Sequence, residues 1–127
     1  MIAALLAWHE QHEQAAAALR PVTALPAHVM TEAYAVLTRL PLGFAVAPRA
    51  AARVLTSRFG GAPLCLDDAA RRILLGRLAD AGVFGGASYD ALVAMEAAAH
   101  DRTLLTLDER AQATYQRLGI AVRVIAA

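Results

Sequence analysis

Lysine and asparagine are both absent from this 127-residue sequence, and cysteine occurs once. All 12 basic residues are therefore arginine, and with 11 acidic residues they give a net charge of +1. This balance argues neither for nor against a nucleic-acid partner. The arginine bias fits either a GC-rich coding sequence or selection for bidentate phosphate contacts. With the single thiol of Cys65, an intramolecular disulfide is impossible and a reducing compartment is the natural fit.

Long apolar runs are absent as well. No stretch of about 18 uninterrupted apolar residues occurs, and no basic segment precedes an apolar one as a signal peptide requires. We therefore expect a soluble, cytoplasmic protein with no membrane partner. Aromatic residues make up 6% of the chain and hydrophobic residues 58%, because alanine supplies much of the apolar content. The core should rest on Leu, Val and Ala, and the length suits one domain, residues 1–127.

Hydrophobic periodicity and end signals set the expected elements. Helical spacing predicts helices over residues 1–19, 29–40, 48–59, 69–81, 89–99 and 109–118. Short apolar or β-branched runs predict strands or extended segments at 22–28, 63–66, 103–107 and 122–125. Alternation of such elements predicts an α/β fold with a mainly parallel sheet flanked by helices.

The same patterns predict which individual side chains are buried. Ile73, Leu74 and Leu78 are predicted to face the core from helix 69–81. Cys65 reads as a small core residue, because nothing near it in the sequence suggests an activating base.

The stretch from Gly85 to Gly119 places two acids beside predicted elements. Asp90 stands in the first turn of an apolar helix for which Ser88 is a suitable N-cap, and it heads the stripe of that helix that turns inward. Asp108 directly follows a short strand, where open α/β sheets bind their ligands. The alternative for each acid is that it only stabilises the start of a helix.

Glu32 is the third candidate acid. It flanks the apolar face of helix 29–40 between Val29 and Val36, a place where Glu is seldom left unpaired. Glu32, Asp90 and Asp108 at one sheet edge, without clustered His or Cys, would form an oxygen-rich site that suits Mg²⁺ or Mn²⁺ rather than zinc. Such an ion would bind phosphates and support phosphodiester hydrolysis.

At these residues the sequence resembles the PIN-domain ribonucleases, specifically the VapC-type toxins of bacterial toxin–antitoxin modules. The resemblance covers essentially the whole chain and is carried by LPAHVMTEAYAVLTRL with Glu32, GGASYDALVAM with Asp90 and TLLTLDERA with Asp108. It implies a PIN-like α/β fold, a Mg²⁺- or Mn²⁺-dependent endoribonuclease of a type II system, an RNA substrate, a cognate antitoxin and frequent homodimers. By matching position, Glu32, Asp90 and Asp108 are the catalytic and metal-binding residues, and Thr106 supplies a hydroxyl beside them.

The resemblance also implies a missing part. Family members begin with a strand that ends in Asp followed by Thr or Ser, before the segment that here reads IAALLAWHE. We therefore expect the first strand and the first metal-binding Asp to be absent. Either the start codon is assigned too far downstream, which we favour, or the chain is a truncated, noncatalytic module that still binds an antitoxin or itself. A third alternative is an all-helical interaction domain.

Overall fold

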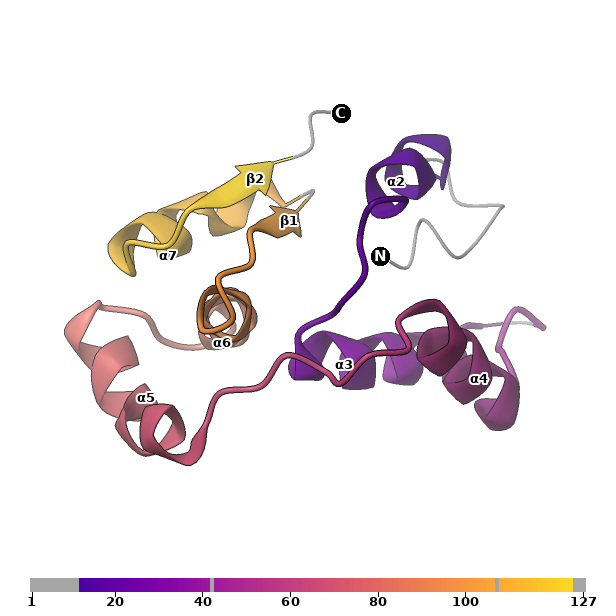
Figure 1. Ribbon diagram of the computed structural model, residues 1–127, viewed down its shortest axis with the longest axis horizontal. Coiled ribbons are helices and arrows are strands. Elements are labelled where there is room, and N and C mark those ends of the chain that lie inside the picture. Colours follow the sequence, from indigo (N-terminus) through magenta and orange to yellow (C-terminus); the bar gives the residue numbers. More distant parts are fainter. Residues whose placement is uncertain (1–11, 42, 107, 125–127) are drawn as a thin grey trace. The chain divides into compact units, whose positions relative to one another are not determined.

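The computed structural model describes residues 12–41, 43–106 and 108–124 (Figure 1). Contacts within the chain divide it into two compact units, Met1–Pro63 and Leu64–Ala127. The first unit contains the helices α2 (His12–Leu19), α3 (Ala27–Thr38) and α4 (Pro48–Arg58). The second contains α5 (Asp68–Asp80), α6 (Ala87–Ala98), β1 (Leu104–Thr106), the 3₁₀ turn η1 (Glu109–Ala111), α7 (Gln112–Arg117) and β2 (Val122–Val124). The helical predictions are confirmed within a few residues wherever they fall on described residues.

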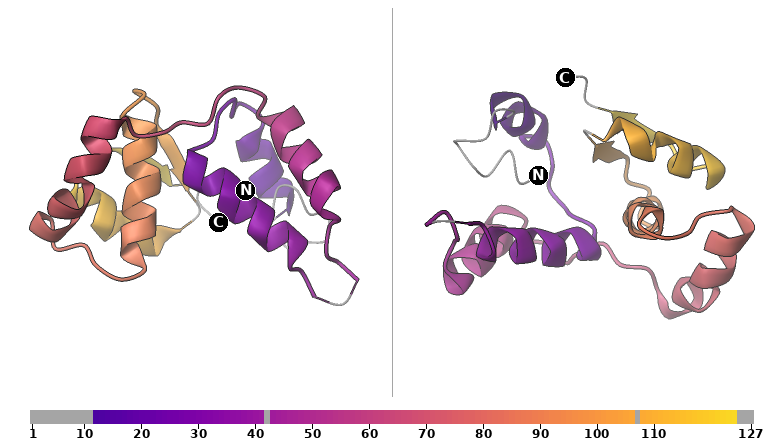
Figure 2. Two further views of the ribbon diagram at one scale, coloured as in Figure 1. Left: turned by 90° about the horizontal axis from the view of Figure 1, so that it is seen from below. Right: turned by 180° about the vertical axis from the view of Figure 1, so that it is seen from behind.

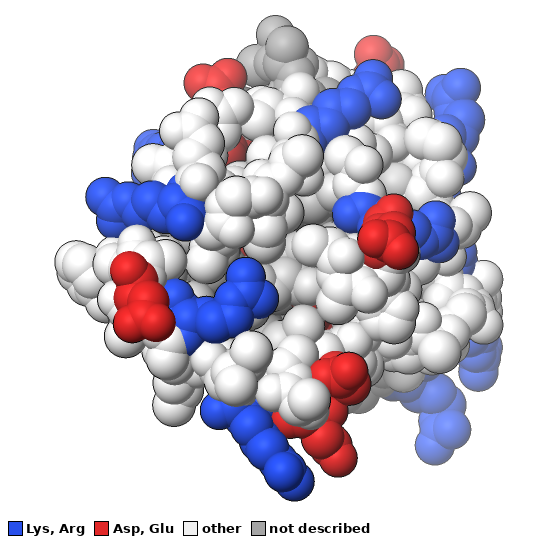
Figure 3. All heavy atoms as spheres, turned by 60° about the vertical axis from the view of Figure 1, so that its left-hand side comes forward, with Lys and Arg blue, Asp and Glu red and all other residues white. Residues whose placement is uncertain are grey.

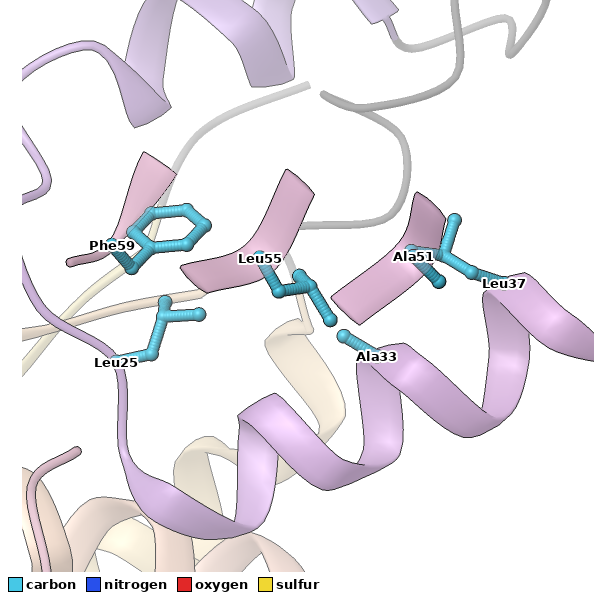
Figure 4. Close-up of a cluster of buried hydrophobic side chains, with 6 residues drawn as sticks. All are labelled: Leu25, Ala33, Leu37, Ala51, Leu55 and Phe59. Carbon is cyan, nitrogen blue, oxygen red and sulfur yellow. The ribbon is translucent and has the colours of Figure 1, made fainter. Parts of the chain in front are cut away.

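The core of the first unit lies between α3 and α4. Figure 4 shows its buried side chains, which are Leu25, Ala33, Leu37, Ala51, Leu55 and Phe59. Ala33 and Leu37 stand four residues apart on α3, and Ala51, Leu55 and Phe59 repeat at the same interval along α4 and its C-cap. Each helix therefore presents one apolar stripe, and the alanines let the two backbones approach closely.

Arg58, the last residue of α4, ties the end of α2 to this core. Its guanidinium donates hydrogen bonds to the carbonyl oxygens of Leu19, at 2.8 Å, and Val22, at 3.0 Å. The carbonyl of Leu19 closes α2, where helical carbonyls lack partners within their own helix. The guanidinium also lies 4.8 Å from the centroid of the Phe59 ring. One side chain thus satisfies exposed backbone acceptors and packs on the core.

Two predicted segments do not form regular strands. In the segment 22–28, residues 22–25 carry no strand and Pro26 makes a single-residue bridge, with a φ of −55° and a ψ of 142° that are those of an extended chain. The alternative of an extended entry therefore holds at Pro26, and α3 begins at Ala27. Residues 63–66 contribute only a single-residue bridge at Leu64. Proline lacks the N–H that a ladder requires, so prolines within both segments disfavour regular pairing.

The other two predicted strands, β1 and β2, form a parallel pair in which Leu104 lies opposite Val122 and Thr106 opposite Val124. The chain between them passes through η1 and α7, as a parallel connection requires. This parallel pair agrees with the α/β prediction and rules out the all-helical alternative. None of the described helices is both long and apolar enough to cross a membrane.

The core of the second unit consists of two clusters. One joins α5 to α6 through Leu74, Leu78 and Met95, and Figure 2 shows these helices side by side. The other lies around Tyr115 and is described with the candidate site below. Two predicted core positions are wrong, because Ile73 is 57% exposed and Cys65 is exposed. The other two predicted core residues of α5, Leu74 and Leu78, are buried, and Leu66, the residue after Cys65, is buried as well.

Adjacent leucines on α5 provide a test of this packing. Leu74 is 8% exposed and Leu75 is 76% exposed. Leu74→Ala is expected to lower the free energy of unfolding by about 2–5 kcal/mol, because it removes buried methyl groups and leaves a cavity. Leu75→Ala, the matched control, should change it by less than about 0.5 kcal/mol. Urea denaturation followed by circular dichroism measures both values, and equal losses would contradict the assigned face of α5.

Candidate functional site

Asp90 lies in the first turn of α6 and is half-buried. The predicted cap is wrong: α6 begins at Ala87 after Gly86, so Ser88 lies inside the helix. Four residues after Asp90, Ala94 is fully buried in the cluster around Tyr115. The stripe that Asp90 heads therefore packs inward as predicted, and the carboxylate is held at the rim of that cluster.

Asp108 follows β1 and is exposed. Its Oδ1 accepts a hydrogen bond of 2.9 Å from the backbone N–H of Arg110 and so caps η1. Its own backbone N–H donates a 3.0 Å hydrogen bond to the side-chain oxygen of Thr106, the last residue of β1. The capping interpretation of Asp108 is confirmed. The capping hydrogen bond engages Oδ1 and orients the Asp108 carboxylate, which stays exposed to solvent.

The charges of both acids affect the buried side chain of Tyr115. The residue is only 4% exposed, and burial raises the pKa of its hydroxyl above the ordinary value. The charge of Asp90 raises this pKa further and the charge of Asp108 does so to a smaller degree, whereas a hydrogen bond with the Thr106 side chain opposes the rise. Both carboxylates therefore act on the same buried hydroxyl. Of the three candidate acids, Asp90 and Asp108 are therefore the two whose charges affect Tyr115.

The sequence contains a signal for Tyr115 that the motif-based prediction missed. Tyr115 stands four residues after Ala111 and four before Gly119, which ends α7 with a φ of +67°. A lone aromatic residue on that stripe of a mostly polar helix indicates a buried ring.

Glu32 belongs to the first unit, whereas Asp90 and Asp108 belong to the second. Its side chain is 62% exposed, and its Oε2 lies 3.5 Å from Nε2 of His28, one turn earlier on α3. Val29 and Val36 beside it are half-buried, as the helical wheel predicted. The carboxylate itself reaches solvent rather than the apolar face.

The donor chemistry of the second unit fits a hard divalent cation. Asp90 and Asp108 carry carboxylate oxygens, and Mg²⁺ is commonly held by one or two carboxylates together with waters. In neither unit do three His, Cys, Asp or Glu side chains gather into a metal-binding group, as far as the described residues extend.

Comparison with known proteins identifies the family. The family model for the PIN domain matches residues 1–117. The chain belongs to the PIN-domain family. This finding confirms the resemblance read from the three acidic motifs, and the helices with their small parallel sheet agree with the predicted PIN-like α/β fold.

Two curated relatives of this PIN domain come from Mycobacterium tuberculosis, strain H37Rv. Ribonuclease VapC40 is 42% identical over 125 residues, which cover 98% of this chain and 93% of the relative. Ribonuclease VapC27 is 44% identical over 124 residues, which cover 98% of this chain and 83% of the relative. No solved structure matches the chain.

Arg side chains are interspersed with Asp and Glu over the face of the protein that Figure 3 shows. With a net charge of +1, such a surface produces little long-range attraction for a polyanion.

Two substitutions at Asp108 separate its capping role from its charge. Asparagine caps helices about as well as aspartate, so Asp108→Asn is expected to leave the free energy of unfolding within about 0.5 kcal/mol of wild type. Asp108→Ala should cost about 0.5–2 kcal/mol, because the N–H of Arg110 loses its acceptor. Chemical denaturation of the three proteins measures the difference. A loss in Asp108→Asn as large as that in Asp108→Ala would contradict the capping role.

Proposed function

We propose that this PIN domain is a VapC-type toxin of a type II toxin–antitoxin system, a metal-dependent endoribonuclease that hydrolyses RNA phosphodiester bonds. The observation that carries the proposal is the similarity to Ribonuclease VapC40 and Ribonuclease VapC27 over 98% of the chain. The effect of both Asp90 and Asp108 on the pKa of Tyr115 supports the same reading. Carboxylates are among the ligands that hold Mg²⁺ in metal-assisted hydrolysis.

Glu32, Asp90 and Asp108 are the proposed catalytic and metal-binding residues. The half-buried first turn of α6 holds Asp90, and the cap on η1 holds Asp108 with one oxygen engaged and the group still exposed. The side chain of Glu32 is not packed in the core, and its carboxylate lies 3.5 Å from His28 of the same helix. A bound Mg²⁺ or Mn²⁺ would supply the activation of water and the stabilisation of the leaving oxygen.

The proposed partners are a cognate antitoxin and a second copy of the chain. Large apolar side chains are exposed on α5 and the loop that follows it, namely Ile73, Leu75 and Phe84. Exposed large apolar side chains are the kind that a protein partner would cover. The single thiol of Cys65 supports a cytoplasmic location. One family model spans residues of both units, which supports a single domain over residues 1–127.

Ribonuclease activity of the purified full chain tests this proposal. The wild type is expected to cut RNA when Mg²⁺ or Mn²⁺ is added and to stop when the ion is chelated. Asp90→Asn removes one negative charge with little change of shape. It should lower the cleavage rate by at least about 100-fold, because loss of even an outer-shell partner of a metal site costs roughly 10–100-fold.

Asp80→Asn is the matched control, since Asp80 is an exposed aspartate at the end of α5 and should leave the rate unchanged. Equal activity of wild type and Asp90→Asn would end the ribonuclease assignment at this site. A folded wild type that cuts no RNA but still binds an antitoxin would favour the noncatalytic alternative.

A further inference from the structure

Positive charge is distributed unevenly along the chain. Residues 33–66 contain four of the 12 Arg residues and no Asp or Glu, whereas the rest of the chain holds the other eight Arg and all 11 acids. The acid-free stretch therefore carries a charge of +4 and the rest of the chain −3, which together give the net charge of +1. The helix α4 lies wholly within the acid-free stretch.

Two of these arginines lie on the side of α4 that faces away from its core. Ala51 and Leu55 are buried and point toward α3 (Figure 4). Arg49 and Arg53 stand two positions before them, which is about 200° around the helix, and both are exposed. Ser57 follows at the same interval of four residues and is exposed as well. Arg49, Arg53 and Ser57 thus form one outward stripe of α4.

The positions of Arg49 and Arg53 are electrostatically unfavourable for the helix itself. Arg49 is the second residue of α4, whose N-cap Ala47 provides no side-chain hydrogen bond and whose first turn contains no acid. Because a helix N-terminus carries partial positive charge, a cation there is destabilising. Arg53 stands four residues later, a spacing at which like charges repel. Among the described residues, no carboxylate pairs with either guanidinium. A bound anion would relieve both repulsions.

The helix α5 shows the arrangement that stability alone favours. Its N-cap Asp67 and its first residue Asp68 place negative charge at the positive end of the helix. Arg71 and Arg72 stand four residues after these acids, and an acid followed by a base at this spacing stabilises a helix. The charges of α5 are therefore explained by the helix itself, whereas those of the outward stripe of α4 are not.

We propose that the outward stripe of α4 binds backbone phosphates of the RNA substrate. The inference rests on the proposed ribonuclease function and adds to it a phosphate-binding surface in the first unit. Guanidinium groups match phosphate oxygens with paired hydrogen bonds, and Arg and Ser are among the side chains that contact phosphates in nucleic-acid complexes. Protein interfaces are instead centred on buried aromatic and other apolar side chains, and the stripe contains none. Charge complementarity therefore favours RNA as the occupant.

Binding of a fluorescently labelled single-stranded RNA to Arg49→Gln/Arg53→Gln tests the proposal in the full chain. EDTA is added to prevent metal-dependent cleavage, so that fluorescence anisotropy measures binding alone. For single strands, each phosphate contact contributes about 0.7 to the slope of log affinity against log salt concentration. Loss of two contacts should therefore reduce that slope by about 1.4 and raise the dissociation constant by about 25-fold at about 0.1 M salt. The difference should nearly vanish at about 1 M salt.

Arg71→Gln/Arg72→Gln is the matched control, because it removes two exposed arginines from a helix that also carries acids. Both double variants change the net charge from +1 to −1, so any general attraction for RNA falls equally in the two. The control should keep a salt slope near that of the wild type and bind RNA much more tightly than the α4 variant. Equal losses in the two double variants would overturn the proposal, since total charge would then explain both.

Thermal melts and a conservative variant separate phosphate binding from a structural role of the two arginines. Arg49→Gln/Arg53→Gln should melt at the temperature of the wild type or above it, because the substitutions remove unfavourable charges. Arg49→Lys/Arg53→Lys keeps both charges and should restore most of the salt slope. A lower melting temperature, with weak RNA binding that lysine does not restore, would contradict phosphate binding.

The outcomes distinguish this inference from the ribonuclease proposal. A wild type that cuts RNA, with unchanged RNA binding in Arg49→Gln/Arg53→Gln, would end the inference and leave the ribonuclease proposal standing. A wild type that binds RNA through the outward stripe but cuts none would support the inference and contradict the proposed activity. Polyglutamate serves as the probe for an acidic protein partner. Weaker polyglutamate binding in the α4 variant, with RNA binding unchanged, would assign the stripe to such a partner and refute the inference.

Discussion

The packing of the Tyr115 ring is the interaction on which the arrangement of the second unit depends. The ring is buried with Ala94 and Ala111, and Leu104 of β1 and Val122 of β2 pack against the same cluster. A bulky aromatic residue fits there because both of its buried neighbours are alanine, so the large side chain fills the space that the small ones leave. The strands, η1 and α6 are thereby gathered around one side chain.

This arrangement shows why structural and functional interpretations of Asp108 need not compete. The cap on η1 uses Oδ1 and fixes the direction of the side chain, and the carboxylate remains exposed at the end of β1. A ligand that is already oriented loses less conformational freedom when an ion binds. Asp90 has a comparable double role, because the first turn of α6 stabilises its charge and the buried stripe below it sets its direction.

The sequence predicted the helices well because their signals are local. Apolar residues at intervals of three and four mark the faces of α3, α4 and α5, and proline or glycine marks several ends. Asp67 caps α5 as the pattern allowed, by accepting a 2.8 Å hydrogen bond from the N–H of Ala70. The two strands that failed, at 22–28 and 63–66, contain prolines and too few residues for periodicity to decide. A strand also needs a partner, which local sequence does not supply.

The sequence by itself determined the family, because the PIN-domain model matches residues 1–117. It also led to the proposal of Glu32, Asp90 and Asp108, each of which stands in a motif with recognisable neighbours. Only the tertiary structure decided that Tyr115 is buried and that the charges of Asp90 and Asp108 both affect its hydroxyl. These residues belong to α6, the segment after β1, and α7, and no spacing along the chain encodes their packing. Which Tyr is buried, and which hydroxyl it bonds, depends on how these elements pack, because burial and hydrogen bonding are properties of neighbours in space.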